Sequence, residues 1–197
     1  MFSGIIQNLG KVVNFSYGEL EISTALNLSD CKAGSSICCN GVCLTATEIT
    51  LNYKEYHFKV NVGEETQQRT TFSPNLFNNS NFINLEKSLK VGDEISGHFV
   101  YGHIDRTSKL IKINHLKNSW EFIFENFQDE DKIYIVDKAS IAINGISLTI
   151  SKSTNENFFI SVIPHTYENT NLKFLKENDM VNIEFDYLAR FIKKSKN

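Results

Sequence analysis

Three polar side chains in the second half of the chain, those of His103, Ser147 and Thr149, are of types that could take part in catalysis. His103 follows a glycine, and an imidazole titrates near neutral pH, so His103 is the first candidate for proton transfer. Ser147 and Thr149 lie two residues apart in a strand-like stretch, so their hydroxyls point to one face, where they could bind a polar ligand or position a water molecule. Simpler roles stay open. His103 could hydrogen-bond a ligand without transferring a proton, and the two hydroxyls could belong to an ordinary half-buried strand.

Four cysteines lie close together, at Cys31, Cys38, Cys39 and Cys43, a grouping that suggests a metal site or a disulfide. Adjacent residues of a strand point to opposite faces, so Cys38 and Cys39 cannot easily bind one ion. We therefore expect reduced core thiols and no metal. Cys43 and Thr45 repeat the two-residue spacing of the hydroxyl pair, and Cys43 is a candidate covalent nucleophile, although no step requires one.

Internal duplication organises the whole chain. Four segments of the first half match four segments of the second half, in the same order and at a nearly constant offset of about 100 residues. The matched pairs are Met1–Ile6 with Phe99–Ile104, Cys39–Thr45 with Ile143–Thr149, Glu65–Thr66 with His165–Thr166, and Ile83–Glu86 with Val181–Glu184. We predict two similar domains, residues 1–90 and 91–186, followed by a short tail at residues 187–197.

The two halves differ at polar positions that match one another. The diverged pairs are Ile5 with His103, Cys43 with Ser147, and Glu65 with His165. We infer that one ancestral pocket became two unequal pockets.

The secondary-structure pattern of both halves is mainly β. Asn40-Gly41 and Asn144-Gly145 lie inside stretches rich in Ile, Val and Thr, and an Asn-Gly pair favours a tight hairpin turn. Further strands are expected at Leu20–Ser23, Glu55–Val62, Glu121–Phe124 and Asn157–Ile163, and short helices at Glu64–Thr70, His165–Thr170 and Leu188–Lys196. Many short strands in two matched units predict an all-β fold of two small antiparallel barrels with a short C-terminal helix.

Composition and charge exclude several classes of protein. No apolar run is long enough to span a bilayer, and the first residues do not resemble a signal peptide, so we expect a cytoplasmic protein. The net charge is -3, without the basic footprint that nucleic-acid binding requires. The cationic residues near the C-terminus are interpreted as a solubilising tail.

Five motifs in order resemble the riboflavin synthase family of the α-chain type. They are Met1–Ile6, Asn40–Thr45, Ser96–Asp105, Asn144–Thr149 and Ile163–Thr166, and the resemblance runs from Met1 to about Ile192. It implies two tandem six-stranded Greek-key barrels followed by a C-terminal helix. Beyond Asp186 the chain has 11 residues, or about 16 Å of helix, which is shorter than in many family members.

The resemblance also implies a reaction. Two molecules of 6,7-dimethyl-8-ribityllumazine would give one riboflavin and one 5-amino-6-ribitylaminouracil by transfer of a four-carbon unit, with no metal or redox cofactor. A duplicated domain offers two copies of one binding site, which agrees with a reaction that consumes two molecules of one substrate. The resemblance further implies a homotrimer in which each active site forms between the first barrel of one subunit and the second barrel of a neighbour. Which barrel holds the donor, and whether the protein associates with lumazine synthase, stay open.

Site residues follow from the same resemblance. The expected catalytic residues are His103, Ser147, Thr149 and Cys43. The expected substrate contacts are Gly4, Ile5, Ile6, Cys43, Leu44, Thr45, Asn61, Val62, Gly63, Glu64, Glu65, Thr66, Gly102, His103, Ile104, Lys138, Ser147, Leu148, Thr149, Ile163, Pro164, His165, Thr166, Tyr167 and Glu168. Ser36, His98 and Asp186 match further polar positions near the family site, and Phe2 could either stack on a bound ring or simply pack in the core.

Two other functions compete with this one. Relatives of the family bind lumazine or flavin without turnover and serve as fluorescent antennae. The chain contains the motif through Gly102-His103 and the pair Ser147 and Thr149, and their presence favours an enzyme over this alternative. A small barrel could also bind single-stranded nucleic acid, but the acidic balance argues against it.

Overall fold

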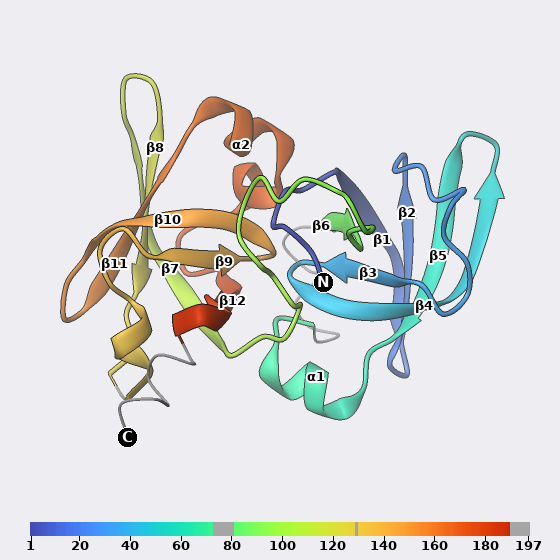
Figure 1. Ribbon diagram of the computed structural model, residues 1–197, viewed down its shortest axis with the longest axis horizontal. Coiled ribbons are helices and arrows are strands. Elements are labelled where there is room, and N and C mark those ends of the chain that lie inside the picture. The colour runs from blue at the N-terminus through green and yellow to red at the C-terminus, as the bar shows by residue number, and fades with distance from the viewer. Residues whose placement is uncertain (73–80, 129, 190–197) are drawn as a thin grey trace.

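Two closed six-stranded barrels lie side by side in the computed structural model, which describes residues 1–72, 81–128 and 130–189 (Figure 1). This arrangement confirms the predicted all-β fold with two duplicated barrels. Residues 187–189 are helical, and the remainder of the expected C-terminal helix lies outside the described residues.

The strands follow one another in the same order in both barrels. The first barrel contains β1 (Asn8–Ser16), β2 (Glu19–Thr24), β3 (Ser36–Cys39), β4 (Val42–Asn52), β5 (Glu55–Asn61) and β6 (Phe82–Lys87). The second contains β7 (Arg106–His115), β8 (Trp120–Glu125), β9 (Ser140–Ile143), β10 (Ile146–Ser153), β11 (Asn157–Val162) and β12 (Met180–Phe185). The first ring runs β1-β2-β5-β4-β3-β6, and the second, read from β7, runs β7-β8-β11-β10-β9-β12. The internal repeat of the sequence is therefore a repeat of the fold.

Each barrel has one short α-helix after its fifth strand, as the sequence predicts. These are α1 (Glu64–Arg69) and α2 (Pro164–Asn169). Two 3-10 helices, Glu130–Tyr134 and Asn171–Phe174, complete the second half. In Figure 1, α1 and α2 lie on opposite sides of the molecule.

Both predicted Asn-Gly hairpins are confirmed. Cys39 pairs with Val42 across the first turn, and Asn40 and Gly41 adopt φ of 46° and 83°. The second turn has the same geometry, with φ of 47° at Asn144 and 80° for the glycine that follows it. Two successive residues with positive φ form the turn whose twist matches that of the flanking strands, and Asn-Gly accommodates it at low cost.

The apolar side chains form one core in each barrel and a small cluster between the barrels. Cys39 belongs to the core of the first barrel, whereas Cys38 packs between the barrels with Phe2, Val100 and Ala142. The adjacent cysteines therefore face opposite sides of β3, and both are buried free thiols, as predicted. Burial raises the pKa of both thiols, so they stay protonated at neutral pH.

Buried asparagines join the two barrels around a local two-fold relationship. The Asn182 side-chain amide donates to the Asn40 carbonyl at 2.9 Å, and the Asn84 amide donates to the Asn144 carbonyl at 3.0 Å. The two turns approach so closely that a Cβ at Gly41 would lie 2.7 Å from a backbone nitrogen of the other turn. These paired bonds fix how one barrel sits on the other.

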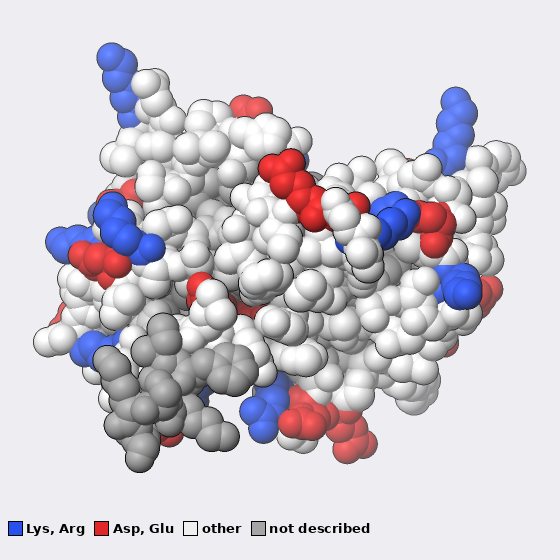
Figure 2. All heavy atoms as spheres, in the orientation of Figure 1, with Lys and Arg blue, Asp and Glu red and all other residues white. Residues whose placement is uncertain are grey.

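Charged side chains are intermixed on the face shown in Figure 2. Lys and Arg lie beside Asp and Glu in small groups near its edges, and much of the centre is uncharged. Among the described residues, no continuous basic track crosses this face, which agrees with the net charge of -3. Among the described residues, no helix combines the length and the apolar character needed to cross a membrane.

Candidate functional site

The segment that precedes each barrel crosses over to the other barrel. The Gly102 carbonyl accepts a hydrogen bond from the Cys43 backbone N–H at 2.9 Å, and Ile104 packs against the core of the first barrel. In the matching half, the Gly4 carbonyl accepts from the Ser147 N–H at 2.8 Å, and Ile6 packs against the core of the second barrel. Each barrel thus provides a wall for the other.

The two crossing segments run antiparallel where they meet. Phe2 and Val100 exchange two backbone hydrogen bonds, of 2.7 and 3.1 Å. The Phe2 side chain is fully buried between the barrels, so within this chain the packing role is correct and the ring is not available to stack on a ligand.

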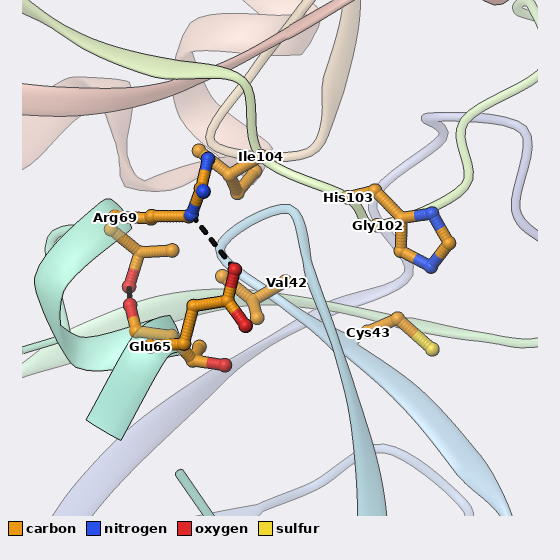
Figure 3. Close-up of a pocket in the computed structure, with 9 residues that line it drawn as sticks. Val42, Cys43, Glu65, Arg69, Gly102, His103 and Ile104 are labelled. Carbon is orange, nitrogen blue, oxygen red and sulfur yellow. Dashed lines mark hydrogen bonds and ion pairs between the residues drawn. The ribbon is translucent and has the colours of Figure 1, made fainter. Parts of the chain in front are cut away.

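A cavity of about 390 Å³ opens between α1, the start of β4 and the crossing segment (Figure 3). Its lining residues are Val42, Cys43, Glu65, Thr66, Arg69, Thr70, Gly102, His103 and Ile104. Figure 3 shows Glu65 and Arg69 reaching toward each other on one side, with His103 and Cys43 on the other. The Glu65 carboxylate lies 3.0 Å from Arg69 Nε. The volume lies within the range of small-molecule sites, and polar groups line it from several directions.

The equivalent region of the second barrel contains a hydroxyl–imidazole pair. Ser147 Oγ lies 2.7 Å from His98 Nδ1. Gly97 allows this approach, because a Cβ there would lie 2.9 Å from Ser147 Oγ. His98 belongs to the segment between the barrels, whereas Ser147 lies 49 residues further on, at the start of β10.

The electrostatics of this pair favour a neutral imidazole. Burial lowers the pKa of His98 from its ordinary value, and the carboxylate of Asp186 opposes that shift. A neutral histidine within hydrogen-bond distance of a hydroxyl can accept its proton.

The structure divides the predicted catalytic residues between the two regions. His103 lines the cavity of the first barrel together with Cys43, while Ser147 pairs with His98 at the second barrel. Thr149 lies two residues further along β10 and is exposed. The sequence proposed His103 and Ser147 as separate catalytic candidates, and the structure places them in different regions of the described residues.

The predicted contact residues also fall into groups. Gly102, His103, Ile104, Cys43, Glu65 and Thr66 line the described cavity, and Gly4, Ile5, Ile6, Ser147, His165 and Thr166 are their repeat equivalents. Leu44 and Val62 are buried in the core of the first barrel, so only their backbone could touch a ligand. The remaining predicted contacts, Thr45, Asn61, Gly63, Glu64, Lys138, Leu148, Ile163, Pro164, Tyr167 and Glu168, do not line that cavity.

Sequence reasoning missed three residues of the cavity, Val42, Arg69 and Thr70. Arg69 had a detectable signal, because it follows Glu65 by four residues and such pairs meet on a helix. Nothing in the linear sequence indicated that His98 pairs with Ser147.

Comparison with known proteins agrees with this architecture. A model of the lumazine binding domain matches the chain twice, at residues 3–88 and 101–186. Riboflavin synthase of Actinobacillus pleuropneumoniae is 36% identical over 98% of this chain and 89% of its own length. Riboflavin synthase of Brucella abortus is also 36% identical, over 97% of this chain and 96% of its own length. The boundaries proposed at residues 90 and 186 stay predictions.

Solved structures show the same fold at lower sequence identity. A crystal structure of LumP complexed with riboflavin has a TM-score of 0.78 and 23% identity, covering 94% of this chain and 99% of that one. LumP complexed with 6,7-dimethyl-8-(1'-D-ribityl) lumazine gives a TM-score of 0.75 at 21% identity, covering 93% of this chain and 98% of that one.

Two barrels with matched crossing segments, each matching the model of the lumazine binding domain, are therefore a duplicated pair of such domains. Within this class, the full-length matches above 30% identity show that the chain belongs to the riboflavin synthase family.

Proposed function

We propose that the chain is a riboflavin synthase that converts two molecules of 6,7-dimethyl-8-ribityllumazine into riboflavin and 5-amino-6-ribitylaminouracil. One observation carries this proposal: both barrels have the same crossing segment, the same hairpin and the same short helix, with different polar side chains at matched positions. A dismutation needs two binding sites for one compound, and the two occupants must play unequal parts.

The polar residues suit the proton transfers of this reaction. The lumazine 7-methyl group becomes acidic because its carbanion is delocalised into the ring, so a base must remove a proton from it. At the second barrel, a neutral His98 with Ser147 Oγ at 2.7 Å can accept a proton through the hydroxyl or activate a water molecule. At the first barrel, His103 and Cys43 flank the cavity and supply the other polar groups.

Close alignment of the two rings supplies a further part of the rate, up to about 7–11 kcal/mol of the barrier in well-oriented reactions. Helix α1 flanks the described cavity, and α2, its counterpart in the second barrel, lies on the opposite side of the chain (Figure 1). A donor and an acceptor bound there could not touch each other within one chain. We therefore propose a homotrimer in which the first barrel of one subunit faces the second barrel of its neighbour.

Subunit mixing tests this shared site. His103→Ala removes a side chain from the first pocket and Ser147→Ala removes one from the second. If each active site combines two subunits, a mixed population of the two variants contains some sites with both residues intact, and activity rises above that of either variant alone. Unchanged activity after mixing, together with a monomeric mass by sedimentation, would refute the shared site.

The central experiment is turnover of the purified protein. It is mixed with 6,7-dimethyl-8-ribityllumazine, with no added metal or nicotinamide, and flavin absorbance is followed over time. One riboflavin formed for every two lumazines consumed supports the proposal. Tight binding without riboflavin would instead indicate an antenna-type binding protein, the alternative that shares this fold.

The proposal includes a cytoplasmic location for the biosynthetic step. Because lumazine synthase makes the substrate, co-purification of the two proteins would test the association that the sequence leaves open.

A further inference from the structure

Two buried glutamates occupy matched positions, on the last strand of each barrel. Glu86 lies on β6 and Glu184 on β12, with exposed fractions of 2% and 3%. Burial raises the pKa of both carboxyls, and that of Glu184 reaches about 7, although backbone N–H donors act in the opposite direction. A buried carboxylate is costly unless hydrogen bonds satisfy it, so its contacts should indicate its role.

Both carboxylates bind the segments that cross between the barrels. Glu184 Oε1 accepts from the Tyr101 N–H at 2.7 Å, and its Oε2 accepts from the N–H groups of Gly102 at 2.8 Å and His103 at 3.1 Å. Glu86 Oε1 accepts from the backbone N–H and the hydroxyl of Ser3, at 2.8 and 2.9 Å. Glu86 Oε2 accepts from the N–H of the next residue, Gly4, at 3.0 Å.

The contacts are reciprocal between the barrels. The segment held by Glu184 lines the cavity of the first barrel, because its Gly102 carbonyl bonds to Cys43 and His103 lies on the cavity wall. The segment held by Glu86 bonds through Gly4 to the second barrel. A carboxylate on one barrel therefore sets the position of a wall on the other.

We propose that Glu184 is a positioning residue for the pocket of the first barrel, and Glu86 for that of the second. Each glutamate holds the crossing segment that precedes its own barrel, and that segment forms a wall of the other barrel. The inference rests on the proposed function only for the identity of the ligand, since it specifies how the binding walls of that same site are held.

The first test needs no ligand. Glu184→Gln keeps one acceptor oxygen but replaces the other with an NH₂ group, which faces backbone donors and cannot accept from them. Hydrogen exchange of the full chain should become faster at residues 101–103 and stay unchanged at residues 3–4. The matched variant Glu86→Gln should give the reverse pattern. Unchanged exchange at the nearby crossing segment in both variants would overturn the proposal.

The second test measures binding at each barrel separately. Trp120 is the single tryptophan and stacks on Tyr167 of α2, with ring centroids 4.0 Å apart, so quenching of its emission by riboflavin reports mainly on the second barrel. Total binding is followed by flavin fluorescence. Glu86→Gln should weaken the tryptophan-detected step by roughly 10- to 100-fold, the range expected for losing one bond to a charged group. Glu184→Gln should weaken the other step by a similar factor.

Several results separate the inference from the proposed function. If the wild-type protein binds riboflavin but forms none from lumazine, the proposed reaction fails, while the exchange and binding patterns still decide the roles of the glutamates. If both variants weaken both steps equally, the glutamates only stabilise the fold and the inference is wrong. If Glu184→Gln does not fold, Glu184→Asp takes its place: it retains the charge but is one methylene shorter, so exchange at residues 101–103 should again increase selectively.

Discussion

Replacing Gly102 with alanine should displace the wall of the first pocket. Gly102 has a φ of +81°, and a Cβ on it would lie 2.5 Å from the Cβ and 2.6 Å from the backbone nitrogen of Cys43. A left-handed backbone costs an alanine about 1–2 kcal/mol. Forcing a methyl group into filled space costs about 1–3 kcal/mol more. We therefore expect a loss of about 2–5 kcal/mol in the free energy of unfolding, or roughly 10 °C in Tm for a domain of this size.

Gly34 provides a matched control, because its φ is +93° and nothing lies within 4 Å of a Cβ built on it. Gly34→Ala carries the backbone cost without the clash. The difference between the two variants therefore isolates the contact with Cys43, at about 1–3 kcal/mol. Urea unfolding followed by circular dichroism measures both stabilities, and flavin fluorescence measures riboflavin binding.

Gly102→Ala should also weaken riboflavin binding at the first barrel, whereas Gly34→Ala should leave binding unchanged. Equal stability losses in the two variants would refute the close packing of the crossing segment on Cys43. A selective loss of stability with normal binding would refute the assignment of that segment to the pocket wall.

Three further predictions concern other side chains. The pKa of Glu184 is about 7 in the folded chain against an ordinary 4.5, because the effect of burial outweighs that of its amide donors and Asp105 adds to the shift. Between about pH 4.5 and 7 the folded chain therefore holds a proton that the unfolded chain releases. This group makes the free energy of unfolding fall by up to about 3 kcal/mol as pH rises through that window. Glu184→Gln should remove that slope from urea unfolding measured across this window. Asn182→Ala, at a fully buried position, should cost about 2–5 kcal/mol because it leaves a backbone carbonyl and a backbone N–H without partners; a change below 1 kcal/mol would contradict the role of the asparagine network. Tyr167→Leu should shift the emission of Trp120 to longer wavelength by removing its stacking partner, and an unchanged spectrum would mean that the rings do not stack in solution.

The sequence determined the repeating unit and its local elements. Asn40-Gly41 and Asn144-Gly145 predicted both hairpins, because the chemistry of a tight turn depends on the residues within it. The short helices at Glu64–Arg69 and Pro164–Asn169 were also predicted, since their signals are local. The matched motifs identified the family, because ordered similarity over nearly the whole chain is a property of the linear sequence.

The tertiary structure decided which residues share a pocket. The sequence proposed His103, Ser147 and Cys43 as separate candidates and did not say which of them share a pocket. The fold puts His103 near Cys43 and pairs Ser147 with His98. The reason is that the segment before each barrel crosses to the other barrel. The position of a motif along the chain therefore does not reveal which barrel the motif contacts.

The role of Glu184 likewise became visible only in the folded chain. In the sequence it is one acidic residue in a mainly apolar strand that also contains Asn182, and its repeat equivalent lies in a similar strand. Its three amide donors lie more than 80 residues away, at Tyr101, Gly102 and His103. Contacts between segments so distant in the chain depend on how the closed barrels pack together, and no local pattern of residue types encodes that packing.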